Sequence, residues 1–495
     1  MKSRRAILQI VAFGTAELFA ACTFVRSRPD LPPITQPPLK KVIPPPLVTP
    51  TPVSRKPVVH VITTATSTPQ APATTIIFET WGVPTMLSAF TEVIQSFETT
   101  MPWITVRSRL DNALTSDGQR ARLHSGGRFD VTRIAPEDVF DFTASGFLHG
   151  LTDRVTHDED LRNFAPRTID SRVGPSGEQA VLSLGARYQC VLYNMQHFEQ
   201  AGVTPPNGWH DSWTVPEFEQ HAQRLVIANH NRVDRFGLTA IPAYIRPVLA
   251  EAAENDPTGG FVDVTGRISM MATPERERHL SRLSAWQTTL RVELPIPGRS
   301  NTTFNAELSA MYIDRSDVGP SIRQAVPWGV APLPAWRNRN ALTEGEELCV
   351  GINSQSDEPD ASWSFVRFLV EPTAQRSLAR TDLVIPFRTE VLDDPAVLDP
   401  NRRPLDRSIL IEANKHSMRS PSHPGSKAWH VMTGPAVIPV RRGKQTASDY
   451  LRTADRVISN QLEIRARSAG NIRPGYRQSL PYGNRLRTEL SPAEG

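Results

Sequence analysis

The motifs that mark catalytic or metal centres are missing from this 495-residue sequence. It contains no G-x-S-x-G, H-E-x-x-H, G-x-x-x-x-G-K-[ST] or G-x-G-x-x-G pattern. The twelve histidines are scattered, and acidic pairs such as Asp158 and Asp160 indicate solvated loops. No two of the cysteines, Cys22, Cys190 and Cys349, have metal-ligand spacing. We therefore expect no enzymatic activity, no cofactor and no metal ion, and a secreted hydrolase is the weakest alternative.

Side chains suited to noncovalent recognition follow two predicted strands. The apolar, β-branched segments "TIIFETWG" (75–82), "WITVRSRL" (103–110) and "FDVTRIA" (129–135) predict strands, with helical spacing between the first two. This alternation predicts an α/β protein with a doubly wound, mainly parallel sheet. Because ligands bind beyond the carboxyl ends of such strands, Trp81 and the residues after Ile134 are expected at a binding cleft.

Two helices are predicted from their end signals. A helix over 136–145 is favoured by Glu137 in its first turn and by Gly146 as its cap. In "WTVPEFEQHAQRLV", Thr214 is the expected N-cap, and Glu217 stands three residues later, as in a capping box. The helix over 136–145 directly follows the third strand, so Glu137 should lie close to the predicted cleft.

Charge is unevenly distributed along the chain. The formal net charge is +4, but residues 1–75 hold nine Lys or Arg and two acidic residues. The rest of the chain has 46 basic and 49 acidic residues. A basic nucleic-acid surface is therefore not expected on the folded part. The length favours two or three domains.

The first residues predict export. "MKSRRAILQIVAFGTAELFAAC" has a charged start and an apolar run too short to cross a bilayer, as a signal peptide does. "SRRAIL" resembles a twin-arginine signal, so the general secretory and twin-arginine routes both stay open. "FAAC" resembles the lipobox of bacterial lipoproteins, which implies that Cys22 is diacylated; the alternative is a buried cysteine in an ordinary helix. The Pro-rich stretch that follows favours an extended spacer.

Segments over residues 76–465 resemble, in order, the extracytoplasmic solute-binding proteins of ABC importers. The resemblance is to the carbohydrate-binding class that includes maltose-binding protein. It is carried first by "IIFETWG…AFTEVIQSFETTMPWITV", "FDVTRIAPEDVFDFTASGFLHGLTD" and "VLYNMQHFEQAGVTPP…SWTVPEFEQHAQRL". It continues through "SAMYI", "WGVAPLP", "CVGINSQSDEPDASWSFVRFLVEPTAQRSLA" and "RRGKQTASDYLRTADRVISNQL". The order of the segments is the specific signal, because each one alone is weak.

The resemblance implies a two-lobe periplasmic-binding-protein-like fold of type II, with a mainly parallel sheet in each lobe and hinge strands between the lobes. It implies a monomer that captures a solute, expected to be a sugar or oligosaccharide, and delivers it to ABC permease subunits. A lipid anchor would hold it on the outer face of the cytoplasmic membrane. A ligand sensor of the same fold, or a relative without sugar affinity, stays open. The expected organisation is a signal peptide at 1–21, a tether at 22–75, lobe 1 at 76–187 and 349–388, lobe 2 at 190–347 and 392–465, and a polar tail at 466–495.

Sugar sites combine aromatic platforms with planar polar partners. By the resemblance, the expected ligand-binding residues are Trp81, Glu137, Arg187, Tyr188, Asp314, Asp317 and Trp429. Core packing for Trp81 and Trp429, and helix-dipole stabilisation for Glu137, are the alternatives. Arg187 in place of an acid suggests an acidic or phosphorylated solute. Asp314 and Asp317 belong to "DRSD", where relatives have Gly and an aromatic, so a solvated loop is the alternative there.

Cys190 and Cys349 form a separate hypothesis. The resemblance places both on neighbouring hinge strands, where a disulfide would limit lobe motion. The alternative is two small buried apolar side chains.

Overall fold

The computed structural model of this protein describes residues 73–81, 84–110, 118–119, 121–122, 128–163, 178–230, 232–253, 261–262, 268–295, 301–337, 341–395, 397–399, 401–419 and 423–468. Cys22, the predicted signal peptide, the tether up to residue 72 and the tail beyond 468 lie outside these residues. The strands within them form one sheet of order β2-β1-β3-β9-β4-β7-β6-β5, with β10 beside β9 and β8 beside β4.

One half of the sheet is built from the amino-terminal strands. β1 (Thr74–Thr80) pairs in parallel with β2 (Ile104–Leu110) and β3 (Val131–Ile134), as their sequences predicted. The apolar face of α2 (Pro84–Thr100) packs on β1, where Phe90 lies edge-on to Phe78 with ring centroids 5.0 Å apart. The other helices and 3-10 turns before β4, and those between β9 and β10, are η1 (Pro136–Asp138), α4 (Val139–Ala144), α5 (Thr152–His157), α6 (Glu159–Asn163), α13 (Pro359–Phe368), α14 (Pro372–Arg380), α15 (Thr389–Leu392), α16 (Ser408–Glu412) and η5 (Ala413–His416).

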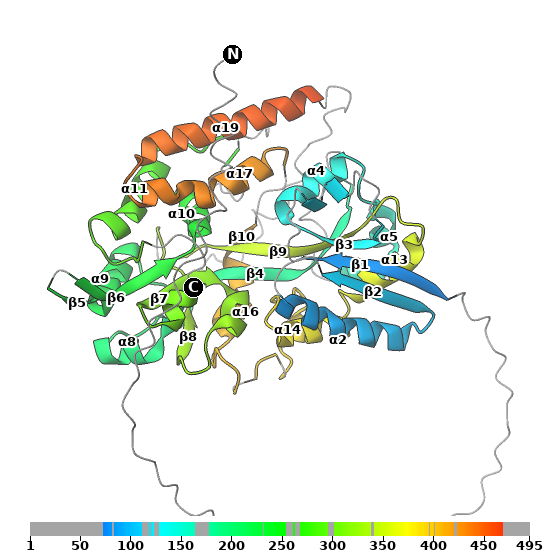
Figure 1. Ribbon diagram of the computed structural model, residues 1–495, viewed down its shortest axis with the longest axis horizontal. Coiled ribbons are helices and arrows are strands. Elements are labelled where there is room, and N and C mark those ends of the chain that lie inside the picture. The colour runs from blue at the N-terminus through cyan, green and yellow to red at the C-terminus, as the bar shows by residue number, and fades with distance from the viewer. Residues whose placement is uncertain are drawn as a thin grey trace, which may run out of the picture. The chain divides into compact units, whose positions relative to one another are not determined.

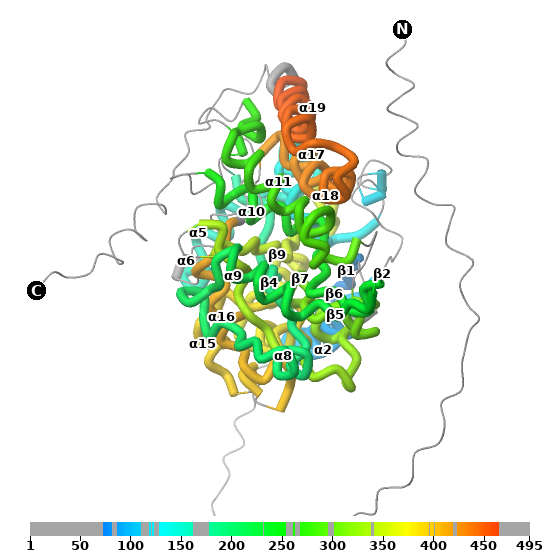
Figure 2. The backbone as a smooth tube through the Cα atoms, turned by 90° about the vertical axis from the view of Figure 1, so that its left-hand side faces the viewer, coloured from blue at the N-terminus to red at the C-terminus, as the bar shows by residue number. Residues whose placement is uncertain are grey.

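The other half has its own core. β6 and β7 are parallel, β4 is antiparallel to β7, and fully buried Trp286 and Tyr244 stack in the core with ring centroids 5.9 Å apart. The strands are β4 (Val181–Asn194), β5 (Ile227–Asn229), β6 (Arg232–Ala240), β7 (Ser309–Arg315) and β8 (Trp328–Ala331). The helices and turns are α8 (Met195–Ala201), η2 (Trp209–Asp211), α9 (Val215–Leu225), η3 (Pro242–Tyr244), α10 (Ile245–Glu251), α11 (Pro274–Thr288), α12 (Asn301–Asn305) and η4 (Ser316–Ser321). α17 (Ser426–Met432), η6 (Pro435–Val437) and α18 (Ile438–Arg441) follow one another along the chain. α19 (Ala447–Ser468) lies over α17 and α18 (Figures 1 and 2).

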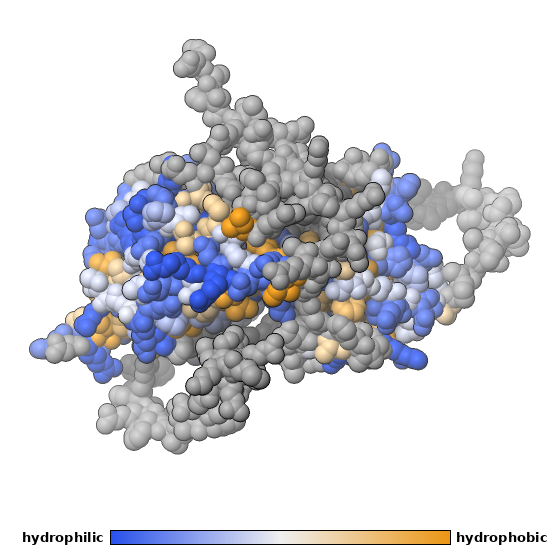
Figure 3. All heavy atoms as spheres, turned by 90° about the horizontal axis from the view of Figure 1, so that it is seen from above, coloured by the Kyte–Doolittle hydropathy of each residue, from blue (hydrophilic) through white to orange (hydrophobic). Residues whose placement is uncertain are grey.

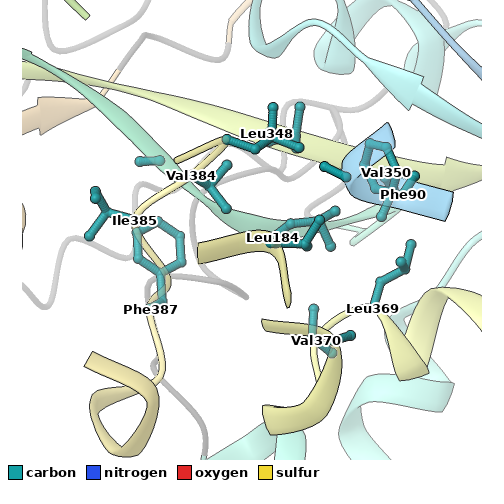
Figure 4. Close-up of a cluster of buried hydrophobic side chains, with 14 of the residues drawn as sticks. Phe90, Leu184, Leu348, Val350, Leu369, Val370, Val384, Ile385 and Phe387 are labelled. Atoms are coloured by element: carbon teal, nitrogen blue, oxygen red, sulfur yellow. The ribbon is translucent and has the colours of Figure 1, made fainter. Parts of the chain in front are cut away.

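Two long strands join the halves (Figure 1). β4 and β9 (Thr343–Ile352) are antiparallel to each other, and β10 (Ser417–Arg419) lies beside β9. A third segment crosses beside them, because Ala186 and Ile385 exchange backbone hydrogen bonds of 3.1 and 2.9 Å. Gly185 permits this contact: its φ is +135°, and a Cβ there would lie 2.5 Å from the Ile385 carbonyl oxygen. Figure 4 shows the apolar packing around this crossing.

The hypothesis of a Cys190–Cys349 disulfide is wrong. Neither cysteine forms a disulfide, and both are buried. The strand register places Cys349 opposite Ser183, seven residues along β4 from Cys190. That spacing corresponds to about 20 Å along a strand, whereas a disulfide needs Cα atoms within about 7 Å. The two cysteines are therefore small buried side chains.

Both helices predicted from end signals are present. The segment 136–145 forms η1 followed by α4. α9 begins after Thr214, whose backbone N–H donates to Glu217 Oε2 at 2.8 Å. Among the helices in the described ranges, none combines the length and apolar character that a membrane crossing requires.

The described surface is mixed in polarity. Seen from above, hydrophilic residues are interrupted by several small apolar groups (Figure 3). Large exposed apolar side chains come from separate elements, among them Met195 of α8, Ile227 of β5 and Ile464 of α19. Single apolar residues on a surface are ordinary, so attention falls on the charges that the fold buries.

Candidate functional site

Charged side chains are buried where β4 and β9 cross between the halves. We call residues 186–189 of β4 and 343–347 of β9 the charged section. Arg187 is 5% exposed, Glu346 9% and Glu344 1%, and the register sets Arg187 opposite Glu346. Burying an ionised group is costly unless it is paired, so each of these charges needs a partner.

Two side chains of the charged section form a closed set of ion pairs with Arg315 of β7 and Asp317 of η4. Arg187 donates to Asp317 Oδ2 at 2.8 Å and also to Glu346. Arg315 donates to Glu346 Oε2 at 2.6 Å, and its Nε lies 3.9 Å from Asp317 Oδ1. Each arginine thus faces both carboxylates, which fixes the position of Asp317 at the start of η4.

The two predicted aspartates have opposite electrostatic environments. Burial alone would raise the pKa of Asp317, but the neighbouring Arg187 and Arg315 outweigh it and lower that pKa. Burial raises the pKa of Asp314, and the Tyr312 hydroxyl donates a hydrogen bond to it. "DRSD" is therefore not a solvated loop. Of its two aspartates, Asp317 has the lowered pKa and Asp314 the raised one.

Trp81 lies at the end of β1, against an arginine of the neighbouring strand. The guanidinium of Arg133 is 4.0 Å from the centroid of the indole. Arg133 Nη1 donates to the Trp81 carbonyl at 2.7 Å, and Trp81 Nε1 donates to the Arg133 carbonyl at 3.3 Å. Burial, with the charge of Arg187 nearby, lowers the pKa of Arg133 to about 9. Trp81 remains partly exposed, as a contact with a solute would require.

A further chain of polar side chains connects α10 and α17 to η1. Arg246 of α10 donates to Glu344 Oε1 at 2.9 Å and to the Nδ1 atom of His430 at 2.9 Å. His430 Nε2 lies 3.4 Å from Glu137 Oε1. The guanidinium of Arg246 is 4.9 Å from the ring centroid of Trp429. Glu137 therefore meets side chains that lie almost three hundred residues further along the chain.

The sequence-predicted residues separate into two sets. Trp81, Glu137, Arg187 and Asp317 each engage polar partners beside the crossing strands, as described above. Tyr188 is 1% exposed and donates to Asn414 Oδ1 at 3.0 Å. Trp429 is also 1% exposed, between Arg246 and Phe261, and Asp314 is held by Tyr312. Ligand contact by any of the seven stays a prediction.

Sequence reasoning missed several charged residues of this region: Arg133, Arg246, Arg315, Glu344, Glu346 and His430. One local signal was available, because "TEGEELCVGI" sets Glu344 and Glu346 two residues apart in an otherwise buried strand. Charged side chains on alternate positions of a buried strand indicate a polar interior site. Arg246 and His430 carry no such signal, since they lie on separate helices 184 residues apart.

No metal centre was found in this region or elsewhere in the part of the chain that the structure describes. The candidate site is a set of fixed hydrogen-bond donors and acceptors with one partly exposed aromatic ring. Such an arrangement is suited to orienting a polar solute.

Solved structures with the same fold come from several bacteria. An ABC substrate-binding protein from Listeria monocytogenes, in complex with cycloalternan, has a TM-score of 0.68 at 18% identity, over 79% of this chain and 99% of that one. The GacH receptor of Streptomyces glaucescens, studied unliganded and with acarbose, has a TM-score of 0.66 at 16% identity, over 79% and 99%. The maltose/maltodextrin-binding domain MalE from Bdellovibrio bacteriovorus, bound to maltotriose, has a TM-score of 0.63 at 17% identity, over 79% of this chain and 100% of that one. These matches confirm the two-lobe α/β fold.

The sequence itself places the chain in a family. The profile of the bacterial extracellular solute-binding proteins matches residues 131–403, which is more than half of the chain. The matched segment runs from β3 through both crossing strands and the charged section. This protein belongs to the bacterial extracellular solute-binding family.

Proposed function

We propose that this protein captures a carbohydrate at the candidate site and delivers it to an ABC permease. One observation carries the proposal: Trp81, Glu137, Arg187 and Asp317, predicted as sugar contacts, each have fixed polar partners beside the crossing strands. Carboxylates and guanidinium groups match sugar hydroxyls in geometry, and an indole face matches a sugar ring. The structural relatives in complex with cycloalternan and maltotriose support this solute class.

The proposed mechanism is conformational. Lobe 1 is taken as residues 76–187 and 349–388, and lobe 2 as residues 190–347 and 392–465. A solute that contacts both lobes favours the closed form by its differential affinity, and the closed form docks on the permease. No bond in the solute is made or broken, and the partner ATPase uses the ATP.

Anchoring belongs to the same proposal. Family membership implies an extracytoplasmic location. We infer that Cys22 is lipidated after removal of the signal peptide and that residues 22–75 act as a spacer. The protein would then work as a monomer on the outer face of the cytoplasmic membrane. Mass spectrometry that finds an unmodified Cys22, or a different first residue, would contradict this.

The function is tested with a thermal-shift screen of the full chain against sugars, sugar acids, polyols and glycerophosphodiesters. A carbohydrate should raise the melting temperature, because binding to the native state alone stabilises it. If only a non-carbohydrate does so, the solute class is wrong; if nothing does, solute capture is wrong.

The predicted platform is tested with Trp81→Ala. The variant should bind the carbohydrate about threefold to tenfold more weakly, since an aromatic contact contributes about 0.5–1.5 kcal/mol beyond area burial. Isothermal titration calorimetry gives the affinity. Trp363→Ala is the matched control, because Trp363 is a partly buried tryptophan of α13 near Arg154, away from the site. Equal affinities of the two variants would exclude Trp81 as a contact.

A further inference from the structure

The side chain of Arg246 is held in one orientation by partners on β9 and on α17 with its C-cap residue. It is 1% exposed. Its Nη1 donates to both oxygens of Glu344 at 2.9 and 3.2 Å, and its Nε donates to Thr433 Oγ1 at 3.0 Å. The ring of Trp429 supports it from one side at 4.9 Å. Its remaining nitrogen, Nη2, is directed at His430.

The contact between Arg246 and His430 determines where the imidazole carries its proton. A guanidinium group only donates hydrogen bonds, so the Nδ1 atom of His430, 2.9 Å from Nη2, must accept. A neutral imidazole that accepts at Nδ1 carries its hydrogen on Nε2. That Nε2–H faces Glu137, whose Oε1 lies 3.4 Å away.

Burial and the positive charge of Arg246 favour the neutral form of His430. The charged groups that face it are Arg246 of α10, Glu344 of β9, Arg315 of β7, Lys427 of its own helix and Glu137 of η1. Burial, aided by the positive charge of Arg246, lowers the pKa of His430 to about 3. Its unperturbed pKa is about 6.5. The imidazole therefore stays neutral over the physiological range.

We propose that Arg246 is a positioning residue that holds His430 as the Nε2–H tautomer, so that His430 and Glu137 together recognise one hydroxyl group of the solute. His430 donates to the hydroxyl oxygen, and the Glu137 carboxylate accepts the hydroxyl proton. This rests on the proposed function, and it adds a requirement for a neutral hydroxyl at this position. A solute carboxylate there would meet the charge of Glu137 and would be rejected.

Glu137 and His430 also come from different halves of the molecule. Glu137 belongs to η1 after β3, and His430 belongs to α17, which packs in the other half. Next to them, Lys427 of α17 lies 3.7 Å from Asp138 of η1. One hydroxyl held between Glu137 and His430 therefore connects the two halves, and losing the donor should weaken binding of the closed form.

The tautomer is tested first, without any solute, by ¹⁵N NMR of the full chain labelled at histidine. His430, assigned with His430→Gln, should show the neutral Nε2–H form at pH 7 and no protonation down to about pH 5. The double variant Arg246→Met/Glu344→Met removes the buried ion pair as a unit, which preserves folding better than removing one partner. In it, the Nε2–H preference should be lost or the ring should titrate at higher pH. An Nδ1–H form in the unmodified protein, or an unchanged ring in the double variant, overturns the proposal.

Binding of the carbohydrate found by the screen supplies the second readout. Affinity should be flat between about pH 5 and pH 8 in the unmodified protein and should change below about pH 6 in the double variant. His430→Leu should lower affinity about threefold to tenfold, the effect of one hydrogen bond. His430→Gln, whose amide can donate near the Nε2 position, should restore most of it. Equal losses in Leu and Gln variants overturn the hydroxyl contact, whereas absence of any carbohydrate binding overturns the proposed function and leaves the NMR result standing.

Discussion

The same two strands, β4 and β9, bury two different kinds of interior. Residues 181–184 and 348–352 form an apolar section, in which Leu184 and Leu348 lie among the side chains of Figure 4. A few residues along, the charged section of 186–189 and 343–347 also buries an arginine and three glutamates. Apolar packing would have been the stable solution in both places.

The difference indicates where the fold serves binding. A buried ion pair costs desolvation free energy that its attraction only partly offsets. The apolar section stabilises the connection between the lobes, whereas the charged section keeps polar groups preoriented beside Trp81 and Glu137. The following predictions test that division.

The largest effect is expected from Glu346→Leu in the charged section. It removes the carboxylate that Arg187 and Arg315 share, which leaves excess buried positive charge. We expect a loss of about 3–5 kcal/mol in the free energy of unfolding, measured by urea denaturation. Glu346→Gln keeps an acceptor and should lose less. A loss below about 1 kcal/mol in the unfolding free energy of Glu346→Leu would show that Arg187 and Arg315 do not need this carboxylate as a partner.

The apolar section should respond through stability alone. Leu348→Ala removes buried methyl groups from a side chain that is fully buried, and should cost about 3 kcal/mol in unfolding free energy. Solute affinity, measured by calorimetry well below the melting temperature, should stay unchanged. A large affinity loss at intact folding would mean that the two sections are not separate in function.

Acid should affect the two aspartates beside the charged section in opposite ways. The pKa of Asp317 is lowered in the folded state, so its stabilisation is present above about pH 4 and lost as the pH falls through its folded pKa. The pKa of Asp314 is raised, so its contribution declines as the pH rises above about 4. Unfolding measured between about pH 3 and pH 6 should depend less steeply on pH in Asp317→Asn and more steeply in Asp314→Asn. Parallel curves for both variants would contradict these environments.

The smallest effect is expected for an ion pair at the surface. Arg154 and Asp360 pair at 2.5 Å, but the carboxylate of Asp360 is 90% exposed. Asp360→Ala should therefore change the unfolding free energy by about 0–1 kcal/mol, followed by the same urea titration. A loss comparable to that of Glu346→Leu would mean that burial does not distinguish these pairs.

The sequence predicted what depends on neighbours in the chain. The ends of the predicted strands placed Trp81 and Glu137 near the expected cleft. The pair of Thr214 and Glu217 predicted the start of α9. The charged section depends instead on register across β4 and β9, which shifts between Ser183 and Ala186. That register separates Cys190 from Cys349, which no local pattern reports.

Contacts between helices that are far apart in the chain could not be predicted from the sequence either. Arg246 and His430 gain their roles only when α10 packs on β9 and α17 meets the Arg246 side chain, since neither residue has a distinctive neighbour in the sequence. For Trp429, the sequence predicted a ligand contact, which stays a prediction, but it did not report the packing of its ring against Arg246.

The pairing of β3 with β9 has a consequence for biogenesis. Beside that pair, the Asn353 side chain donates to the Phe129 carbonyl, 224 residues earlier in the chain. At about 5–20 residues per second, synthesis of the intervening segment takes on the order of ten to forty seconds. Until β9 is made, the edges of β3 and β4 that it covers stay open to pairing with other chains. The order of synthesis therefore leaves β3 and β4 without the strand that joins them for a large part of the time that the chain is being made.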